Sequence, residues 1–339
     1  MNHHREGSGP PLVLIHGVGH HWQGWKAVIP DLARDFDVIA CDSPGFGHSA
    51  PLRHAGPPTI PAYVDAFERW LAEQGIERPH VAGNSMGGAI ALELARRGVA
   101  ASATAFSPAG FWTPAELKWC QLALGAIIAI PPPVRPAVRA LAAKPSGRAA
   151  LFAVLYRWPK RLSDADAAAA LQAAWDAPAF PGALAAFDHY TYETDGTPLP
   201  VPATVAWGNR DRLLPFRLQA PRAKQLVPEA EHVALGAGHL PVTDDPPAVA
   251  ATIRRTAARA RLDSTHERAA ALPHLPPAGV RGAGRPRTRL GVPQRGVPAV
   301  RRRGRHRLRP RRPSARGHRR RRSGSPVAAW RRGLSGFEG

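Results

Sequence analysis

The sequence predicts an α/β fold in which a mostly parallel sheet carries helices on both of its faces. Residues 11–260 alternate short apolar runs with longer amphipathic stretches, which is typical of strands joined by crossover helices. The run at 80–84 passes directly into an amphipathic stretch through Gly83-Asn84-Ser85-Met86-Gly87. An Ala-rich segment at 113–199 interrupts the alternation, which then resumes. These observations predict a sheet-based core with an inserted helical part.

Each element of this core follows from its local pattern. Apolar runs bounded by turn residues predict strands at residues 12–15, 37–41, 80–84, 101–106, 203–207 and 232–235. Amphipathic stretches predict helices at residues 22–34, 60–74, 247–260 and from the Ser85 turn to Arg97. In the helix at 60–74, apolar residues recur on one face, as packing against a sheet requires.

The pattern divides the chain into three parts. Residues 1–112 and 200–261 form the core, and residues 113–199 form a helical subdomain rich in aromatic residues. Residues 262–339 are dominated by Arg, Pro, Gly and Ala and lack periodic apolar positions. Such a composition buries too little apolar surface to offset the chain entropy lost on ordering. We therefore predict that residues 262–339 are disordered.

The net charge of +21 is unevenly distributed along the chain. Residues 261–339 contain 22 Arg and 3 acidic residues, whereas residues 1–260 contain 24 basic and 22 acidic residues. A basic tail attracts the phosphates of nucleic acids and anionic membranes. Its aromatic residues are only Trp330 and Phe337, so base stacking is not supported. We predict neither a nucleic-acid nor a membrane partner. The tail resembles the product of translating GC-rich DNA in a shifted reading frame.

Cysteine usage and the absence of long apolar runs suggest a compartment. Cys41 and Cys120 form no disulfide framework, which favours a reducing environment. Residues 1–9 are polar and lack the apolar region of a signal peptide. The longest apolar stretch, residues 122–134, is broken by prolines and is shorter than the ~20 residues that span a bilayer. We predict a cytoplasmic protein without a transmembrane helix.

The Gly83–Gly87 motif carries the predicted chemistry. It has the form Gly-x-Ser-x-Gly and places Ser85 on a tight strand-to-helix turn, where bulky neighbours would clash. A helix that begins there directs its N–H groups and positive dipole end at the reacting oxygen. An unaided serine hydroxyl is a poor nucleophile and requires a base within hydrogen-bond reach. Ser85 is therefore the predicted nucleophile.

Two loops at strand ends supply the predicted partners of Ser85. His239 follows the last strand and is the expected base, and Asp211 follows the preceding strand as the acid that orients the base. Catalytic groups collect at this edge of open α/β sheets. Asp244 and Asp245 are the alternative acids, and we expect them to cap the last helix instead.

The loop after the first predicted strand, His16-Gly17-Val18-Gly19, lies at the same edge. The backbone N–H groups of Val18 and Met86 are the predicted oxyanion hole. We expect His16 to order this loop. No metal site is predicted, because the histidines at positions 3, 4, 20 and 21 lack ligand spacing on a defined element.

The sequence resembles the α/β-hydrolase superfamily over about residues 7–260. Five pieces match in order: His16-Gly17, residues 42–49 (DSPGFGHS), residues 83–88 (GNSMGG), residues 208–215 with Asp211, and Gly238-His239. The resemblance implies the α/β-hydrolase fold, with residues 113–199 as a cap that forms part of the substrate wall. Trp119, Trp158, Trp175 and Leu240 are the expected wall residues. The family normally has two strands before the His-Gly strand, and with about ten residues there we expect those strands to be missing.

The predicted activity is hydrolysis of a small-molecule acyl compound, a carboxylic ester first of all, through an acyl-enzyme on Ser85. No cofactor is required. A serine nucleophile argues against epoxide hydrolases and haloalkane dehalogenases, which have Asp at this position. A meta-cleavage-product hydrolase, which breaks a carbon–carbon bond, is one alternative, although those enzymes usually have Trp where this chain has Leu240. The others are a cofactor-free perhydrolase, an inactive truncated or frame-shifted product, and a protein that binds nucleic acid through the Arg-rich tail.

Overall fold

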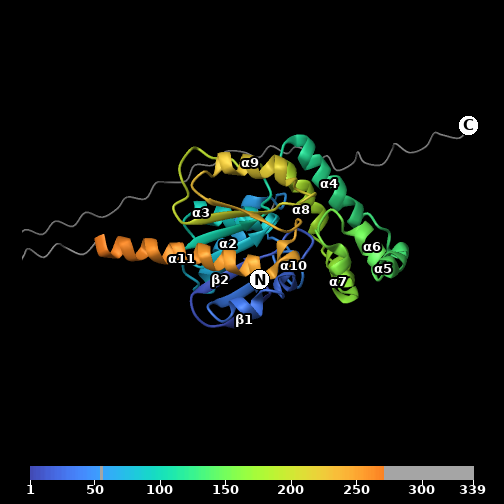
Figure 1. Ribbon diagram of the computed structural model, residues 1–339, viewed down its shortest axis with the longest axis horizontal. Coiled ribbons are helices and arrows are strands. Elements are labelled where there is room, and N and C mark those ends of the chain that lie inside the picture. The colour runs from blue at the N-terminus through green and yellow to red at the C-terminus, as the bar shows by residue number, and fades with distance from the viewer. Residues whose placement is uncertain (54–55, 271–339) are drawn as a thin grey trace, which may run out of the picture. The chain divides into compact units, whose positions relative to one another are not determined.

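The computed structural model describes residues 1–53 and 56–270, with side chains as far as Leu262. Seven strands form one sheet in the order β1-β3-β2-β4-β5-β6-β7 (Figure 1). They are β1 (His3–Gly7), β2 (Pro11–Ile15), β3 (Asp37–Cys41), β4 (His80–Asn84), β5 (Ser102–Phe106), β6 (Ala203–Gly208) and β7 (Glu231–Leu235). All neighbours pair in parallel except β1 and β3. The predicted α/β fold with a mostly parallel sheet is confirmed.

Strand β1 corrects the expectation that both strands before the His-Gly strand are missing. It pairs antiparallel with β3, from His3 opposite Cys41 to Gly7 opposite Asp37. Its sequence, HHREG, is polar and its residues are half-buried or exposed. An edge strand of this kind contributes backbone hydrogen bonds rather than an apolar face, so no apolar pattern reveals it.

Helices cover both faces of the sheet, as predicted. They are α1 (Ile29–Leu32), α2 (Ile60–Glu73), α3 (Met86–Arg96), α9 (Phe216–Leu226), α10 (Pro241–Asp244) and α11 (Pro246–Ala270). One buried core includes residues of α2, α3 and α9, and the other includes residues of α1 and α11. The helix predicted at 22–34 is instead the 3₁₀ helix η1 (Trp22–Trp25) followed by α1. Pro30 explains the break, because proline lacks an N–H and is tolerated only in the first helical turn.

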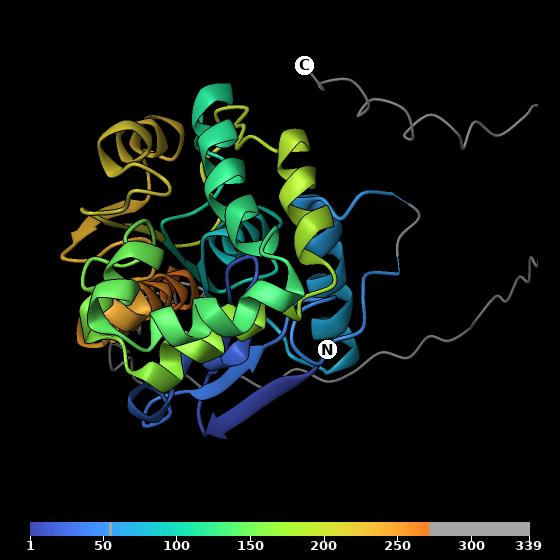
Figure 2. The ribbon, with the colours of Figure 1, turned by 90° about the vertical axis from the view of Figure 1, so that its right-hand side faces the viewer.

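The segment between β5 and β6 is helical. It contains α4 (Pro114–Ile128), η2 (Pro132–Val134), α5 (Arg135–Ala142), α6 (Pro145–Leu151), η3 (Pro159–Arg161), α7 (Asp164–Trp175), α8 (Phe180–Ala186) and η4 (Phe187–His189). We call residues 114–189 the inserted helices; in Figure 2 they lie nearest the viewer. Thr113 and Glu116 form a capping box that fixes the start of α4. Phe152, Tyr156 and Leu171 belong to a small core within the inserted helices.

Helix α11 extends beyond its predicted end at residue 260. It continues to Ala270, so the predicted boundary of a disordered tail at residue 262 is wrong for residues 262–270. The prediction for residues 271–339 lies outside the described residues. The Arg-rich composition that begins at residue 261 therefore starts within a helix.

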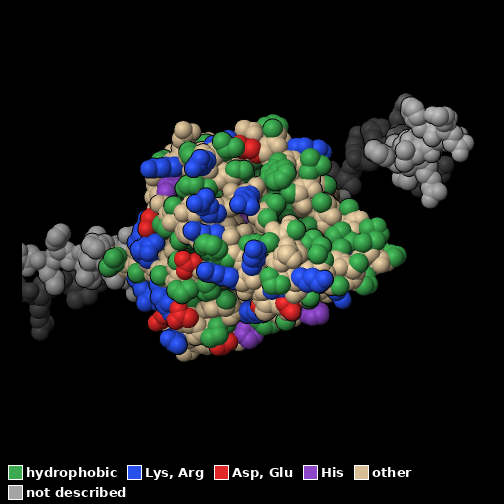
Figure 3. All heavy atoms as spheres, turned by 45° about the vertical axis from the view of Figure 1, so that its right-hand side comes forward, with side chains coloured by type: hydrophobic (Ala, Val, Ile, Leu, Met, Phe, Trp, Pro, Cys, Tyr) green, Lys and Arg blue, Asp and Glu red, His purple; other side chains and the backbone are tan. Residues whose placement is uncertain are grey.

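The described surface is uneven in chemical character. Figure 3 shows hydrophobic side chains gathered at the right-hand end, where Figure 1 places α4, α5 and α6. Within the described residues, the large hydrophobic side chains that are exposed are Trp119, Leu122, Val134, Leu141, Trp158, Leu218 and Leu262. The first five belong to the inserted helices and their connections. No single described helix is both long and apolar enough to cross a membrane.

Candidate active site

The order of the strands reverses at β2, and the candidate site lies at this point. The chain passes from β2 to β3 on one side and then crosses to β4 on the other side of β2. The loops that leave the carboxyl ends of β2 and β4 therefore diverge, and a crevice forms between them. The loop after β2 begins at His16, and the turn after β4 contains Ser85.

Ser85 occupies the turn between β4 and α3 in a strained backbone conformation. Its φ of 55° and ψ of −116° lie outside the regions that L-residues prefer. The residue is buried, and Met86 next to it is the first residue of α3. The first N–H groups of a helix have no partner within the helix, so they are available to a ligand beside Ser85. The turn thus holds the hydroxyl at the positive end of α3.

The two glycines of the motif make this turn sterically possible. A Cβ atom on Gly83 would lie 2.0 Å from the carbonyl oxygen of Gly87. A Cβ atom on Gly87 would lie 2.2 Å from the carbonyl oxygen of Ile15 in β2. Both neighbours are backbone atoms, which cannot rotate aside. The Gly-x-Ser-x-Gly spacing therefore reflects the close packing of α3 against the ends of β2 and β4.

We predict that Gly87→Ala will destabilise the protein by about 3 kcal/mol or more, because the added methyl group forces α3 away from β2. Gly125 in α4 provides the matched control, since a Cβ atom there would meet nothing within 4 Å. Gly125→Ala is expected to stabilise the helix by up to about 1 kcal/mol. Urea unfolding of the two variants measures both effects. Equal unfolding free energies would contradict the steric explanation.

His239 and Asp211 form a buried hydrogen-bonded pair. The Nδ1 atom of His239 lies 2.8 Å from Oδ2 of Asp211. The other carboxylate oxygen of Asp211 accepts hydrogen bonds from the backbone N–H groups of Leu213 at 3.0 Å and Leu214 at 2.8 Å. These two bonds fix the carboxylate so that Oδ2 faces the imidazole. Both predicted partners of Ser85 therefore meet at the carboxyl edge of the sheet.

The loop that carries His239 is held by the inserted helices as well as by the core. The carbonyl oxygen of Leu155 accepts the backbone N–H groups of His239 at 2.7 Å and of Leu240 at 3.2 Å. From the core, the side-chain amide of Asn84 donates to the carbonyl oxygen of His239 at 3.0 Å. The position of the imidazole thus depends on two structural elements far apart in the sequence.

The alternative acids have different roles. Oδ2 of Asp244 accepts the N–H groups of Gly238 and Arg157, both at 2.8 Å, and Oδ1 accepts that of Trp158 at 3.2 Å. Asp244 therefore joins the His239 loop to the inserted helices, and the prediction that it caps the last helix is wrong. Asp245 does cap α11, because its Oδ1 accepts the N–H of Ala248 at 3.2 Å.

His16 orders the loop that passes beside Ser85. Its Nε2 accepts the backbone N–H of Ser43 at 2.8 Å, so Nδ1 carries the proton and donates to the carbonyl oxygen of Gly17 at 2.7 Å. Burial lowers the pKa of His16 to about 4, and the ring is neutral at pH 7. A Cβ atom on Gly17 would lie 3.3 Å from the Ser85 Cβ. The same loop brings Val18 to the wall of the cavity that contains Ser85.

Ser85 and His239 line a small cavity of about 60 Å³. Half of its lining residues come from the inserted helices and are largely apolar: Leu124, Ile127, Phe152, Leu155, Tyr156, Ala170, Leu171, Ala174 and Phe180. Gly17, Val18, Leu213 and Leu240 complete the wall on the core side. The inner cavity is therefore mainly apolar, and its polar lining residues are Ser85, His239, His20, Asn84 and Tyr156.

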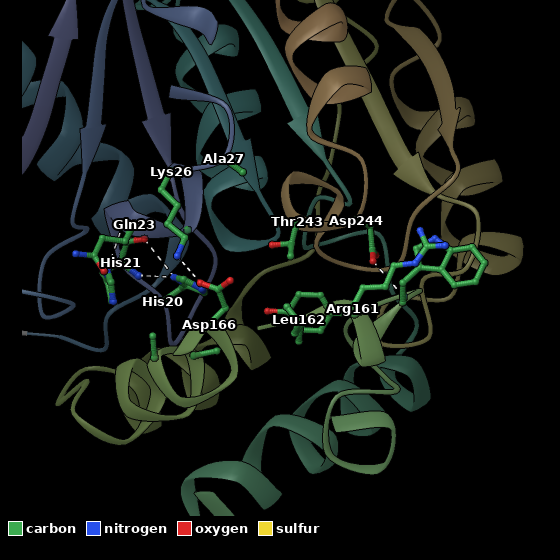
Figure 4. Close-up of a pocket in the computed structure, with 15 residues that line it drawn as sticks. His20, His21, Gln23, Lys26, Ala27, Arg161, Leu162, Asp166, Thr243 and Asp244 are labelled. Carbon is green, nitrogen blue, oxygen red and sulfur yellow. Dashed lines mark hydrogen bonds and ion pairs between the residues drawn. The ribbon is translucent and has the colours of Figure 1, made fainter. Parts of the chain in front are cut away.

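A larger cavity of about 270 Å³ adjoins the inner one and shares His20, Tyr156 and Ala170 with it. Its wall is more polar (Figure 4): Gln23 and Lys26 come from the loop region after β2, and Arg161 and Asp166 from the inserted helices. The Lys26 ammonium and the Asp166 carboxylate form an ion pair between these two parts. The site therefore consists of an apolar inner cavity and a polar outer cavity.

The structure places the four predicted wall residues differently. Trp119 lies outside the inner cavity, because it is on the outward side of α4 and its indole N–H donates to the carbonyl oxygen of Arg212. Trp158 lines the outer cavity, between the guanidinium groups of Arg157 and Arg161. Leu240 lies in the wall of the inner cavity, as expected.

Trp175 also lies outside the inner cavity. Its ring packs under Arg135 and Arg139, and its N–H donates to the carbonyl oxygen of Ile127. Sequence reasoning chose the largest aromatic residues and missed the smaller wall residues, such as Leu124, Phe152 and Phe180. Phe180 packs closely on the loop after β2, because a Cβ atom on Gly19 would lie 2.2 Å from its ring, and this contact between distant residues leaves no signal in the sequence.

The metal-binding groups of the described residues are dispersed. Among residues 1–53 and 56–270 no three His, Cys, Asp or Glu side chains are placed to hold a metal ion together. Cys41 and Cys120 are both buried and unpaired with each other, and burial raises the pKa of Cys120 to about 12. The nucleophilic side chain that faces the inner cavity is Ser85.

Comparisons with known proteins agree with this geometry. Residues 12–252 match the alpha/beta hydrolase family. An uncharacterized protein of Mycobacterium bovis is 28% identical over 260 residues, which cover 71% of this chain and 73% of that protein. The 2-hydroxymuconate semialdehyde hydrolase of a Pseudomonas species is 41% identical over 99 residues, 28% of this chain and 35% of that enzyme. A thermophilic esterase from Thermogutta terrifontis shares the fold, with a TM-score of 0.60 and 23% identity over 78% of this chain and 93% of that one. The chain belongs to the alpha/beta hydrolase family.

Proposed function

We propose that this protein is a serine hydrolase that cleaves carboxylic esters through an acyl-enzyme intermediate. One observation carries the proposal: Ser85, on a strained turn at the start of α3, shares a cavity with His239, whose Nδ1 bonds to the buried Asp211. This arrangement supports the roles of nucleophile, base and orienting acid. The inserted helices act as a cap that excludes water from the acyl group.

The proposed mechanism uses the hydrogen bond between His239 and Asp211. Because the N–H at Nδ1 donates a hydrogen bond to Asp211 and keeps its proton, Nε2 is free to accept the proton of the Ser85 hydroxyl. The serine oxygen attacks the acyl carbonyl, and the N–H groups of Val18 and Met86 stabilise the oxyanion. The imidazolium then protonates the departing alkoxide. Water, deprotonated by His239, attacks the acyl-enzyme, and release of the acid restores Ser85.

The two cavities suggest where the acyl group and the alcohol part of the ester bind. The inner cavity is small and apolar, which fits a short apolar acyl group against Leu124, Phe152 and Phe180. The outer cavity carries Gln23, Lys26 and Arg161, which fit a more polar leaving group. Burial lowers the pKa of His20, which borders both cavities, to about 3, so its ring is neutral. We therefore propose a short-chain acyl ester with a polar alcohol part.

Hydrolysis of a carbon–carbon bond is a second candidate. It is favoured by the 41% identity to a 2-hydroxymuconate semialdehyde hydrolase over 99 residues. The residue after His239 is Leu240, which lies in the wall of the inner cavity, whereas the meta-cleavage-product hydrolases usually have Trp there. An apolar leucine leaves the acyl side of the cavity without an indole N–H donor.

A fluorophosphonate probe tests the proposal, because it phosphonylates activated serines. We expect one modified peptide, containing Ser85, and hydrolysis of nitrophenyl esters with short acyl chains. Absence of labelling in protein that unfolds cooperatively would overturn the serine mechanism. Labelling of Ser85 together with turnover of a dienone substrate and no ester hydrolysis would support the carbon–carbon alternative instead.

A further inference from the structure

The outer side of the inserted helices presents a continuous set of apolar residues to solvent. On α4 these residues are spaced three and four apart, and the same spacing recurs from the end of η2 along α5. We call the set the α4–α5 face: Trp119, Leu122, Ala126, Val134, Ala137 and Leu141, all exposed. The exposed fractions of Trp119, Leu122, Val134 and Leu141 range from 43% to 60%. Figure 3 shows this hydrophobic surface at the right-hand end.

Helix α4 is apolar on two opposite sides. Its inward side places Leu124 and Ile127 in the wall of the Ser85 cavity. A surface helix of a soluble protein normally turns one apolar stripe to the core and a polar face to water. Taken together, α4 and residues Pro132–Ala142 are as long and as apolar as a membrane-spanning helix, although they are bent by 73°. An apolar surface of this extent indicates a binding partner.

The charge around this face identifies the chemistry of the partner. Residues 117–163 contain eight Lys and Arg and not one Asp or Glu, whereas the rest of residues 1–260 contains 16 basic and 22 acidic residues. Lys118, Arg139 and Lys144, on or next to α4 and α5, are exposed. The charged side chains that α4, α5 and their connection contribute beside the α4–α5 face are therefore cations, and the exposed Asp188, which accepts a hydrogen bond from Gln121 of α4, is an acidic group near it. A second copy of this face, or the Arg-rich residues 261–339, would oppose cations with cations.

We propose that the α4–α5 face docks on a lipid bilayer that contains anionic lipids. Its apolar side chains enter the boundary between headgroups and acyl chains, while the surrounding Lys and Arg side chains contact lipid phosphates. Tryptophan and arginine are both favourable at this depth. The prediction of no membrane partner rested on the lack of a spanning segment and on the composition of the basic tail, and neither property reveals an outward apolar face.

Docking places the candidate site beside the lipid. The same helix α4 forms part of the docking face and part of the inner cavity, so docking holds the cavity near the headgroup layer, where esters with a polar alcohol part are accessible. This consequence rests on the proposed hydrolase function. The docking itself does not, because it depends only on residues outside both cavities.

An environment-sensitive fluorophore on a single introduced cysteine tests docking in the full chain. We would label Leu122→Cys on the face and Leu218→Cys on α9 as a control, since Leu218 is exposed to a similar degree, 53%. The native Cys41 and Cys120 are buried, and their raised pKa values keep them unreactive. Vesicles of phosphatidylcholine with about one third phosphatidylglycerol should blue-shift the emission of the label at position 122 and raise it about threefold or more, with little change at position 218.

A substitution in the α4–α5 face distinguishes its contribution to vesicle binding from that of the basic tail, which also attracts anionic vesicles. In co-sedimentation at high salt, Leu122→Glu should weaken vesicle binding about tenfold relative to Leu218→Glu, because the tail contributes equally to both. Leu122→Glu should keep its activity on a soluble ester, and Ser85→Ala should keep its vesicle binding. Co-sedimentation without any response of the label at position 122 would overturn the proposal, since the tail would then be the anchor. A response without vesicles that grows with protein concentration would also overturn it, in favour of self-association.

Discussion

Replacing Ser85 by alanine is expected to reduce kcat/KM for an ester substrate by a factor of about 10⁴ to 10⁶. The substitution removes the hydroxyl that attacks the carbonyl and leaves the cavity wall in place. It keeps the Cβ atom, so the strained turn at φ 55° is neither relieved nor worsened. Initial rates with purified protein, together with the thermal midpoint of unfolding, measure the two effects separately. We expect the midpoint to change little.

Ser43 provides the matched control for this experiment. It is also a buried serine, in the loop after β3, and its hydroxyl oxygen has no hydrogen-bond partner among the described residues. The hydrogen bonds of Ser43, from its N–H to His16 and from the N–H of Phe46 to its carbonyl oxygen, use the backbone and survive substitution. Ser43→Ala should therefore keep kcat/KM within about threefold of the wild type. Similar losses in both variants, or more than a hundredth of the activity in Ser85→Ala, would contradict the assignment of the nucleophile.

Asp211→Asn is the second large effect, an expected loss of about 10⁴ in kcat/KM. The asparagine oxygen can still accept the N–H groups of Leu213 and Leu214, so the loop keeps its structure. Its amide N–H then faces Nδ1 of His239, which must accept instead of donate. The ring proton moves to Nε2, and the base can no longer take the proton of Ser85. Kinetics together with urea unfolding should show lost activity in a stable protein.

Asp244→Asn should lower the stability of the protein more than its activity, in contrast to Asp211→Asn. The Asp244 carboxylate accepts three backbone N–H groups, which an amide with one acceptor oxygen cannot replace. We expect a loss of about 1–3 kcal/mol in unfolding free energy and a fall in activity smaller than about 10² because the His239–Asp211 bond remains. A folded Asp244→Asn protein that is as inactive as Asp211→Asn would reassign the orienting acid.

The parts of the fold and site that could be predicted are those with a local cause. Gly83, Ser85 and Gly87 share one turn whose steric limits are visible in five consecutive residues. His239 and Asp211 could be chosen because each follows a strand of the parallel part of the sheet, and the carboxyl ends of parallel strands meet at one edge. The strand β1 escaped prediction because an exposed edge strand needs no alternation of apolar and polar residues.

The residues that could not be predicted depend on which side of a helix faces inward. Helix α4 is apolar on two opposite sides, so its sequence does not distinguish the side of Leu124, in the inner cavity, from the side of Trp119, in solvent. The largest aromatic residues were expected at the cavity. The packing instead stacks arginine side chains on Trp158 and Trp175 and leaves the wall to leucine and phenylalanine.

The contact of Leu155 was beyond sequence reasoning for a different reason. Its backbone carbonyl, rather than its side chain, accepts the N–H groups of His239 and Leu240. Any residue type supplies such a carbonyl, so no motif records it. The 84 positions that separate residues 155 and 239 also remove any local signal.

This carbonyl has a consequence for how such a protein can diversify. If the inserted helices were only a cover, a new specificity could be obtained by exchanging them as a block between relatives. Because Leu155 holds the backbone of His239, a transplanted block also has to present a carbonyl at the same place, or the histidine loop loses two hydrogen bonds. The inserted helices, which line the substrate cavity, and the loop that carries the catalytic His239 therefore have to change together. Gradual change of side chains such as Phe152 and Leu171 remains open, since it leaves that backbone contact intact.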